Sequence, residues 1–379
     1  MMWLLGALTV VIWLVLWLGH GRFWQTAISP LPGLPKDWPS VVAVIPARNE
    51  AEGIGRTVGS LLGQDYKGRV SVVVVDDEST DGTADVANHT AAVMNASDRL
   101  LVVPGTPTPV GWVGKMWAVA QGLEKAKELD PSARYVLLTD GDISHSDRNI
   151  AHLVARAEAG ALDLTSLMVR LRCVSIAEQA MIPAFVFFFQ MLYPFARVND
   201  TADKTAGAAG GCMLVRHAAL ERIGGIAAIK SALIDDCALA AAMKRNGPIY
   251  LSLTNDAESL RIYGDLSEVW NMIARSAYTQ LNYSPLLLAG TVLGLGLTFL
   301  APPLLALFGH GMAAFFGLIA WIVMAACYSP MLRFYNRPLW WAPLLPVVAL
   351  VYLGATLDSA LRHMRGKGGA WKGRYQAAR

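Results

Sequence analysis

Four long hydrophobic stretches limit the folds open to this chain more than any other feature of its sequence. They are Met2–Leu18, Pro285–Phe308, Met312–Leu332 and Leu339–Leu361. Each is long enough for a helix that crosses a bilayer, which takes about 17 to 25 residues. The chain is 54% hydrophobic and 16% charged, with a mean hydropathy of +0.39, which is too apolar for one ordinary soluble domain. We therefore expect an N-terminal transmembrane anchor at 1–22 and a C-terminal transmembrane region at 285–361.

Basic residues beside these stretches indicate on which side of the membrane the rest of the chain lies. Arg22 follows the first stretch, and Arg333 and Arg337 lie between the last two. Positive residues favour the cytoplasmic side, so we expect a multi-pass protein of the cell (inner) membrane whose central region is cytoplasmic. The basic tail at 362–379 conflicts with three full crossings, which would place it outside. Either the tail is translocated, or a proline-bearing stretch, the second or the fourth, is re-entrant.

The region between the hydrophobic ends, residues 38–283, has the mixed composition of a globular domain. Its apolar runs are VVAVIPARNE from Val41, RVSVVVVDDEST from Arg69, RLLVVPG from Arg99 and ARYVLLTDGDIS from Ala133. Continuous β-branched runs are typical of strands buried on both faces of a parallel sheet. A helix through Trp117–Leu129 separates the last two strands. The pattern predicts an open, mostly parallel α/β sheet flanked by helices, with ligands at the carboxyl ends of the strands.

Acidic residues gather where two of these strands end. Asp76 and Asp77 follow the second strand, and Asp140 and Asp142 follow the fourth. If the two strands are neighbours, both pairs share one crevice, and that much negative charge needs a cation or hydrogen-bond donors. The alternative is that the acids cap helices and fill turns, as DESTDGT can do.

Other features narrow the class of protein. The net charge is only +3 and the central region shows no interleaved basic and aromatic residues, so nucleic acid is not expected as a partner. The cysteines lack metal-site spacing and are expected to be reduced, buried side chains. They are Cys173, Cys212, Cys237 and Cys327.

Six motifs in order give the central region a resemblance to a known family. They are VIPARNEAEGI, VVVVDDESTDGT, GWVGKMWA, LLTDGDIS, AGGCMLVR and IDDCALA. In this order the region resembles the family 2 glycosyltransferases, whose nucleotide-binding fold is called GT-A. The segments SLMVRLRCVS, IPAFVFFFQMLYPFA and ALIDDCALA resemble the hopanoid-associated membrane glycosyltransferases. The resemblance implies an inverting hexosyltransferase that moves a sugar from a nucleotide-sugar donor, a UDP-sugar, to a lipid acceptor such as a hopanoid.

The resemblance also implies roles for particular residues. Asp76 or Asp77 would bind the base and ribose together with the loop before the first helix, and Lys115 would reach the diphosphate. The alternative for Lys115 is a solvated lysine at a helix start. The expected donor-binding residues are Pro46, Ala47, Arg48, Asn49, Glu50, Asp76, Asp77, Lys115 and Asp140.

The D-x-D of Asp140 and Asp142 can direct carboxylate oxygens at one hard divalent ion, so Mg²⁺ or Mn²⁺ is the expected cofactor. Asp236 takes the family's general-base position, and Asp235 is its acidic neighbour. Gly210 and Gly211 would let the backbone approach the acceptor, although a structural glycine turn is the competing explanation.

The family's Q-x-x-R-W motif is not intact. The segment ARSAYTQLNYS offers Arg275, Gln280 and Tyr283 on the acceptor side, but Asn282 stands where an arginine is expected. A further apolar run, 181–195, is too short to span and is expected to lie in the membrane interface, or else to be a buried core helix.

Two other functions remain open at this point. In the first, the acceptor is a polyprenyl phosphate, whose transfer needs no general base. In the second, the chain is a non-catalytic membrane binding or scaffold protein with a degenerate site.

Overall fold

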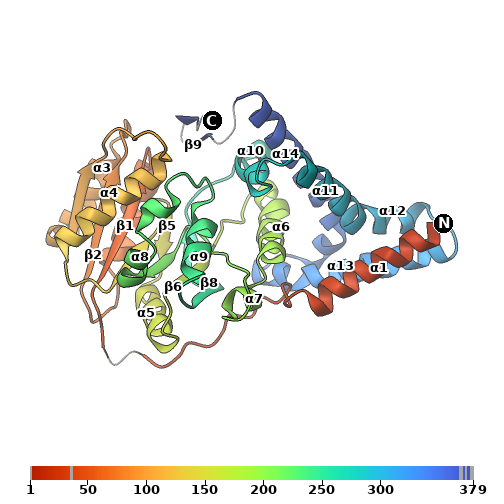
Figure 1. Cartoon of the computed structure of the whole chain (residues 1–379), viewed down its shortest axis with the longest axis horizontal. Coiled ribbons are helices and arrows are strands. Elements are labelled where there is room, and N and C mark those ends of the chain that lie inside the picture. The colour runs from red at the N-terminus through yellow and green to blue at the C-terminus, as the bar shows by residue number, and fades with distance from the viewer. Residues whose placement is uncertain (1, 35–36, 367–369, 372–373, 376–379) are drawn as a thin grey trace. The chain divides into compact units, whose positions relative to one another are not determined.

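A computed structural model describes residues 2–34, 37–366, 370–371 and 374–375 (Figure 1). The chain divides into two compact units. We call Ala27–Arg172 with Arg197–Arg261 the sheet unit, and Met1–Thr26, Cys173–Ala196 and Ile262–Arg379 the helical unit. Segments 173–196 and 262–283, which the sequence places in the central domain, therefore group with the helical unit.

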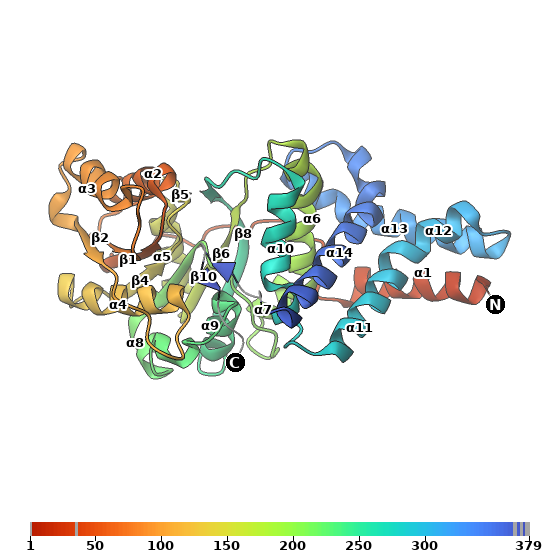
Figure 2. The same ribbon diagram turned by 90° about the horizontal axis from the view of Figure 1, so that it is seen from above.

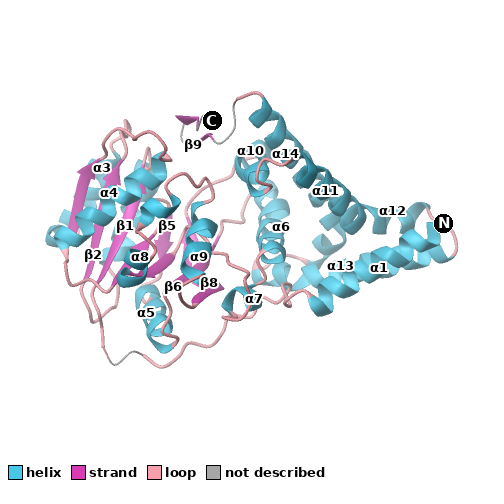
Figure 3. Cartoon of the chain, in the orientation of Figure 1, coloured by secondary structure: helices cyan, strands magenta, loops and turns pink. Residues whose placement is uncertain are grey.

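The sheet unit is built on one eight-stranded sheet. In spatial order the strands are β3 (Leu100–Pro104), β2 (Val70–Asp76), β1 (Val41–Ala47), β4 (Tyr135–Leu138), β7 (Met213–Arg216), β6 (Leu164–Arg170), β8 (Ile249–Ser259) and β5 (Ile143–His145). Only β7 and β5 run against the others. The predicted mostly parallel α/β sheet is therefore confirmed (Figure 3).

Helices cover both faces of this sheet. They are α2 (Ala51–Leu62), α3 (Thr83–Val93), α4 (Gly114–Leu129), α5 (Asn149–Ala159), α8 (His217–Arg222) and α9 (Asp235–Lys244). Figure 2 shows α2 and α3 on one side of the sheet and α4 on the other. Every residue of β1 is buried, as its unbroken apolar run predicts. Gly122 lets α4 lie close to the sheet, because a Cβ there would overlap Val44 Cγ1 and lie 3.1 Å from Val75 Cγ2.

The register of the sheet brings the acidic strand ends to one edge. Ala47 of β1 pairs with Asp76 of β2, and Val44 pairs with Leu138 of β4. The two acid-bearing strands, β2 and β4, are not neighbours, because β1 lies between them. Because β2 and β4 both run parallel to β1, their carboxyl ends lie at the same edge of the sheet, and the acids that follow them lie on either side of the end of β1.

The helical unit contains α1 (Met2–Gly19), α6 (Ile176–Leu192), α10 (Leu266–Gln280), α11 (Pro285–Leu295), α12 (Ala301–Phe308), α13 (Met312–Phe334) and α14 (Leu345–Met364), and α7 (Phe195–Asn199) follows α6. Four of the described helical runs are long and apolar enough to cross a membrane: Met2–Gly19, Pro285–Phe308, Met312–Phe334 and Leu339–Met364.

The run Pro285–Phe308 continues through a π-helical segment at Gly296–Leu300. The indole Nε1 of Trp13 donates to the Thr298 carbonyl of this segment at 2.7 Å. Pro302 lies in the first turn of α12, where proline is tolerated. The run is therefore one helical path and does not double back. The side of the membrane on which the basic tail lies stays a prediction, and part of that tail, 367–369, 372–373 and 376–379, lies outside the described residues.

The 181–195 run forms most of α6. Ile182 and Phe187 are completely buried, and Tyr352 of α14 donates its hydroxyl to the Met181 carbonyl at 3.2 Å. At its ends Ile176 and Leu192 are exposed. The helix is thus packed among the apolar helices of its own unit, and its place at a membrane interface stays a prediction.

Candidate active site

The loops that follow β1 and β2 hold each other in place. The Asn49 side chain accepts the Thr80 N–H at 2.9 Å, and Asp76 Oδ1 accepts the Ser79 N–H at 3.0 Å. Asp81 accepts the N–H groups of Thr83 and Ala51. Asp81 therefore serves as the acceptor that closes this turn at the start of α3.

Arg48 is the positive partner of two further acids in this cluster, Asp77 and Glu78. Its Nη1 lies 3.6 Å from Asp77 Oδ2 and 3.5 Å from Glu78 Oε2. Asp77 is almost completely buried, and its N–H donates to the Ala47 carbonyl at 2.8 Å. Glu50 lies against Gly141, where a Cβ would be 3.2 Å from Glu50 Cγ. The predicted donor-binding loop and the D-x-D segment therefore touch.

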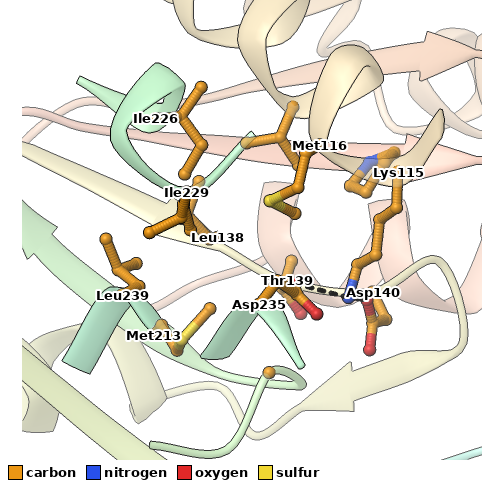
Figure 4. Close-up of a pocket in the computed structure, with 13 residues that line it drawn as sticks. Lys115, Met116, Leu138, Thr139, Asp140, Met213, Ile226, Ile229, Asp235 and Leu239 are labelled. Carbon is orange, nitrogen blue, oxygen red and sulfur yellow. Dashed lines mark ion pairs between the residues drawn. The ribbon is translucent and has the colours of Figure 1, made fainter. Parts of the chain in front are cut away.

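Lys115, near the start of α4, joins two acids that are far apart in the sequence. Its Nζ lies 2.8 Å from Asp140 Oδ1 and 3.2 Å from Asp235 Oδ2 (Figure 4). Only 19% of the Lys115 side chain is exposed, so the solvated-lysine alternative is wrong. Burial alone would lower the pKa of Lys115, but the carboxylates of Asp140 and Asp235 outweigh it and raise the pKa above its ordinary value.

Asp236, in the first turn of α9, is held by two backbone donors. Its Oδ2 accepts the Gly210 N–H at 2.9 Å, and its Oδ1 accepts the Cys237 N–H at 2.7 Å. Burial and the neighbouring Asp235 raise the pKa of Asp236 to about 6, against the lowering effect of the Cys237 N–H and Lys115. This carboxylate can accept a proton near neutral pH.

The two glycines before β7 differ in what surrounds them. A Cβ on Gly210 would lie 3.5 Å from Asp236 Oδ2 and 3.7 Å from Lys115 Nζ, so the Gly210 backbone forms a wall of the site. A Cβ on Gly211 would lie 3.1 Å from both Val169 methyl groups. The absence of a side chain at Gly211 therefore serves packing, and its predicted role on the acceptor side stays a prediction.

A pocket that opens to solvent lies beside these groups, and the empty space in it, open solvent included, is about 290 Å³ (Figure 4). Its polar lining comes from Lys115, Thr139, Asp140, Gly210 and Asp235. Its apolar lining comes from Pro46, Met116, Val119, Leu138, Met213, Ile226, Ile229 and Leu239. Charged groups thus lie at one end of a largely apolar wall.

The D-x-D carboxylates suit a hard divalent ion. Within the described residues no group of three or more His, Cys, Asp or Glu side chains could hold a metal. Mg²⁺ is commonly bound by one or two carboxylates with substrate phosphates and water completing the shell, and Asp140 and Asp142 as the protein ligands stay a prediction. The Asp142 backbone is fixed by the Leu260 N–H at 2.7 Å. The residues present fit such an ion.

Three predicted acceptor-side residues, Arg275, Gln280 and Tyr283, belong to the helical unit rather than the sheet unit. Arg275 is exposed, whereas Gln280 donates to the Tyr193 hydroxyl at 2.6 Å. Tyr283 stacks on His363 with ring centroids 4.2 Å apart. The structure brings together the other predicted site residues, all of which lie in the sheet unit.

Sequence reasoning missed Thr139, His145 and Asn149, which form a buried polar group behind the D-x-D segment. No signal in the sequence separates them from ordinary strand and helix residues.

Several solved structures resemble this chain in their fold. The solved structure of the mannosyltransferase PcManGT from Pyrobaculum calidifontis, in complex with GDP-Man and Mn²⁺, matches with a TM-score of 0.55 at 17% identity, covering 96% of this chain and 99% of that one. A second match is S. aureus TarS, with a TM-score of 0.41 at 21% identity, covering 63% of this chain and 40% of that one. A third is the Mycobacterium tuberculosis glucosyl-3-phosphoglycerate synthase in complex with Mg²⁺ and UDP, with a TM-score of 0.42 at 18% identity, covering 68% of this chain and 85% of that one.

The likeness to the mannosyltransferase shows a GT-A-type fold. Residues 42–224, just under half of the chain, match the model of the glycosyl transferase family 2. Together, the fold and this match support a family 2 glycosyltransferase domain.

Proposed function

We propose that this protein is a membrane glycosyltransferase that moves a sugar from a UDP-sugar to a lipid hydroxyl, with inversion and with a divalent metal. The observation that carries the proposal is the position of Lys115, which joins Asp140 of the D-x-D to Asp235 beside the base candidate. The donor-binding candidates Lys115 and Asp140 line one pocket with Asp235 and Gly210, and Asp236 accepts the Gly210 N–H, so the groups that a transfer reaction needs lie close together.

The donor's base and ribose would lie against the 46–50 loop and Asp76. Arg48 neutralises Asp77 and Glu78, which leaves Asp76, with one oxygen on the Ser79 N–H, available to accept hydrogen bonds from a sugar hydroxyl or a base N–H. Lys115 then contacts the diphosphate as a point charge.

Asp140 and Asp142 would hold Mg²⁺ or Mn²⁺. When bound, the ion supplies positive charge that stabilises the leaving diphosphate. Asp236 takes the proton of the acceptor hydroxyl as general base, and its raised pKa matches that task better than the pKa of an ordinary aspartate. Asp235 stays paired with Lys115 and orients it.

The lipid acceptor is inferred from the apolar helices. Four helical runs of suitable length and the apolar helix α6 occur in one chain with the transferase domain. The positions of Arg22, Arg333 and Arg337 favour a cytoplasmic catalytic domain in the inner membrane. The motifs shared with hopanoid-associated enzymes favour a hopanoid over other lipids.

A comparison of lipid masses tests this function. Lipids are extracted from cells that carry the wild-type protein, the Asp236→Asn variant or no protein. We expect a hopanoid species that is heavier by one sugar only with the wild type. If the extracts instead contain a glycosylated polyprenyl phosphate, in equal amounts for the wild type and for Asp236→Asn, the acceptor group is a phosphate and not a hydroxyl. No difference among the three extracts would refute lipid glycosylation.

A further inference from the structure

Three polar side chains behind the active site are almost completely withdrawn from solvent. Thr139 follows β4, His145 ends β5 and Asn149 begins α5, with exposed fractions of 2%, 5% and 0%. Thr139 Oγ1 lies 2.7 Å from the Gly211 carbonyl oxygen and 3.1 Å from His145 Nε2. His145 Nδ1 lies 2.8 Å from Asn149 Nδ2. Most buried polar groups in proteins are hydrogen-bonded, and these three side chains bond to one another and to the Gly211 carbonyl.

The direction of each hydrogen bond follows from its neighbours. The Gly211 carbonyl can only accept, so the single Thr139 hydroxyl proton points to it. Thr139 Oγ1 must then accept from His145, which places the proton of the neutral ring on Nε2. The unprotonated Nδ1 accepts from Asn149 Nδ2. We call this sequence, from Asn149 through His145 and Thr139 to Gly211, the buried hydrogen-bond chain.

The chain connects the two chemical halves of the site. Thr139 immediately precedes Asp140, a donor and metal candidate. Gly211 immediately follows Gly210, whose N–H holds the carboxylate of Asp236. The β4–β7 ladder has its last pair at Leu138 and Met213, so the Thr139 hydroxyl is a side-chain link between the two segments beyond that ladder.

We infer that His145 is a positioning residue for sugar transfer, which acts through Thr139 to fix the D-x-D segment relative to the segment that holds Asp236. This inference rests on the proposed function. Burial lowers the pKa of His145 to about 4, so the ring stays neutral near pH 7 and keeps the required proton arrangement. The Ser60 hydroxyl accepts the His145 N–H at 3.1 Å and fixes its backbone.

The test uses substitutions that remove or keep single hydrogen bonds. Thr139→Val removes the hydroxyl and Thr139→Ser keeps it, while His145→Asn has an amide side chain too short to donate to Thr139. The matched control is Thr165→Val on β6 of the same sheet, because Thr165 is equally buried and its hydroxyl has no hydrogen-bond partner among the described residues. Purified full-length variants are compared for kcat, for the KM of the UDP-sugar and for melting temperature.

We expect Thr139→Val and His145→Asn to lower kcat about tenfold or more, with the donor KM within about threefold, because a lost buried hydrogen bond displaces groups used in the transition state. Thr139→Ser should recover most of the loss, and Thr165→Val should match the wild type. Equal kcat for wild type and Thr139→Val would overturn the inference. So would a fall in kcat that is proportional to the fall in melting temperature across all the variants, because it would reflect lost stability alone. A wild type without transfer activity would instead refute the proposed function.

Discussion

Replacing Asp236 by asparagine should abolish most of the transfer activity and yet make the folded protein more stable. The general-base role predicts a fall in kcat of about two to four orders of magnitude. Donor affinity should change by only a few-fold, because the cavity's donor side is built from other residues. The two effects have separate physical causes and can be measured on one preparation.

The stability gain follows from the raised pKa. The pKa of Asp236 rises from 3.8 to about 6, so the ionised carboxylate costs the folded state up to about 3 kcal/mol at pH 7. This cost in folding free energy grows as the pH rises from 3.8 to about 6, and it is complete above about pH 6. Asparagine carries no charge, but it can satisfy only one of the N–H groups of Gly210 and Cys237, which offsets about 1 kcal/mol or more.

The assay is thermal unfolding of wild type and Asp236→Asn in detergent at pH 5 and pH 7.5, with Asp98→Asn as a control for an exposed acid. The variant should melt a few degrees above the wild type at pH 7.5 and closer to it at pH 5. The pH profile of wild-type kcat should fall on the acid side near pH 6. Transfer at the normal rate by Asp236→Asn would show that another group removes the proton, and lost donor binding would place Asp236 in the donor site.

Three further predictions concern other parts of the molecule. In a calorimetric titration, a chelator should weaken the binding of a UDP-sugar to the wild type but should not change its binding to Asp142→Asn. A chelator effect of equal size on both proteins would remove Asp142 from the metal site. Gly122→Ala should lower the unfolding free energy by about 1 to 3 kcal/mol, because its Cβ would overlap Val44, while Gly59→Ala, with no atom nearer than 3.5 Å, should not. The Gly373→Cys variant, in a cysteine-free background, should not react with an impermeant thiol reagent in sealed cells but should be labelled after the cells are permeabilised. Labelling in sealed cells would place the basic tail outside the cell.

Strands β1, β2 and β4 were predictable because their apolar runs are buried on both faces of the sheet. The valine runs of β1 and β2 have no polar alternation, and they form neighbouring strands. β7 was not predictable, because Met213–Arg216 is short and its antiparallel place between β4 and β6 depends on packing far away in the sequence. For the same reason the grouping of α6 with the helical unit could not be read from its composition.

The site was predictable as a set of acids but not as a set of pairs. The sequence shows Asp76, Asp77, Asp140 and Asp236 at element ends, where polar side chains converge. It does not show that Arg48 neutralises Asp77, or that Lys115 lies between Asp140 and Asp235, because these partners meet only when the loops fold together. The buried hydrogen-bond chain through His145 carries no sequence signal at all, since a lone histidine and threonine are common in any core.

Release of UDP by the purified protein tests the central claim most directly. The full-length protein in detergent is mixed with a UDP-sugar, a hydroxyl-bearing hopanoid and Mn²⁺, and UDP is measured over time for wild type and Asp236→Asn, with and without chelator. We predict UDP release and one glycosylated lipid per UDP only for wild type with metal. The same release from Asp236→Asn, or release by wild type that the chelator does not affect, would contradict a metal-dependent transfer that uses Asp236 as its base.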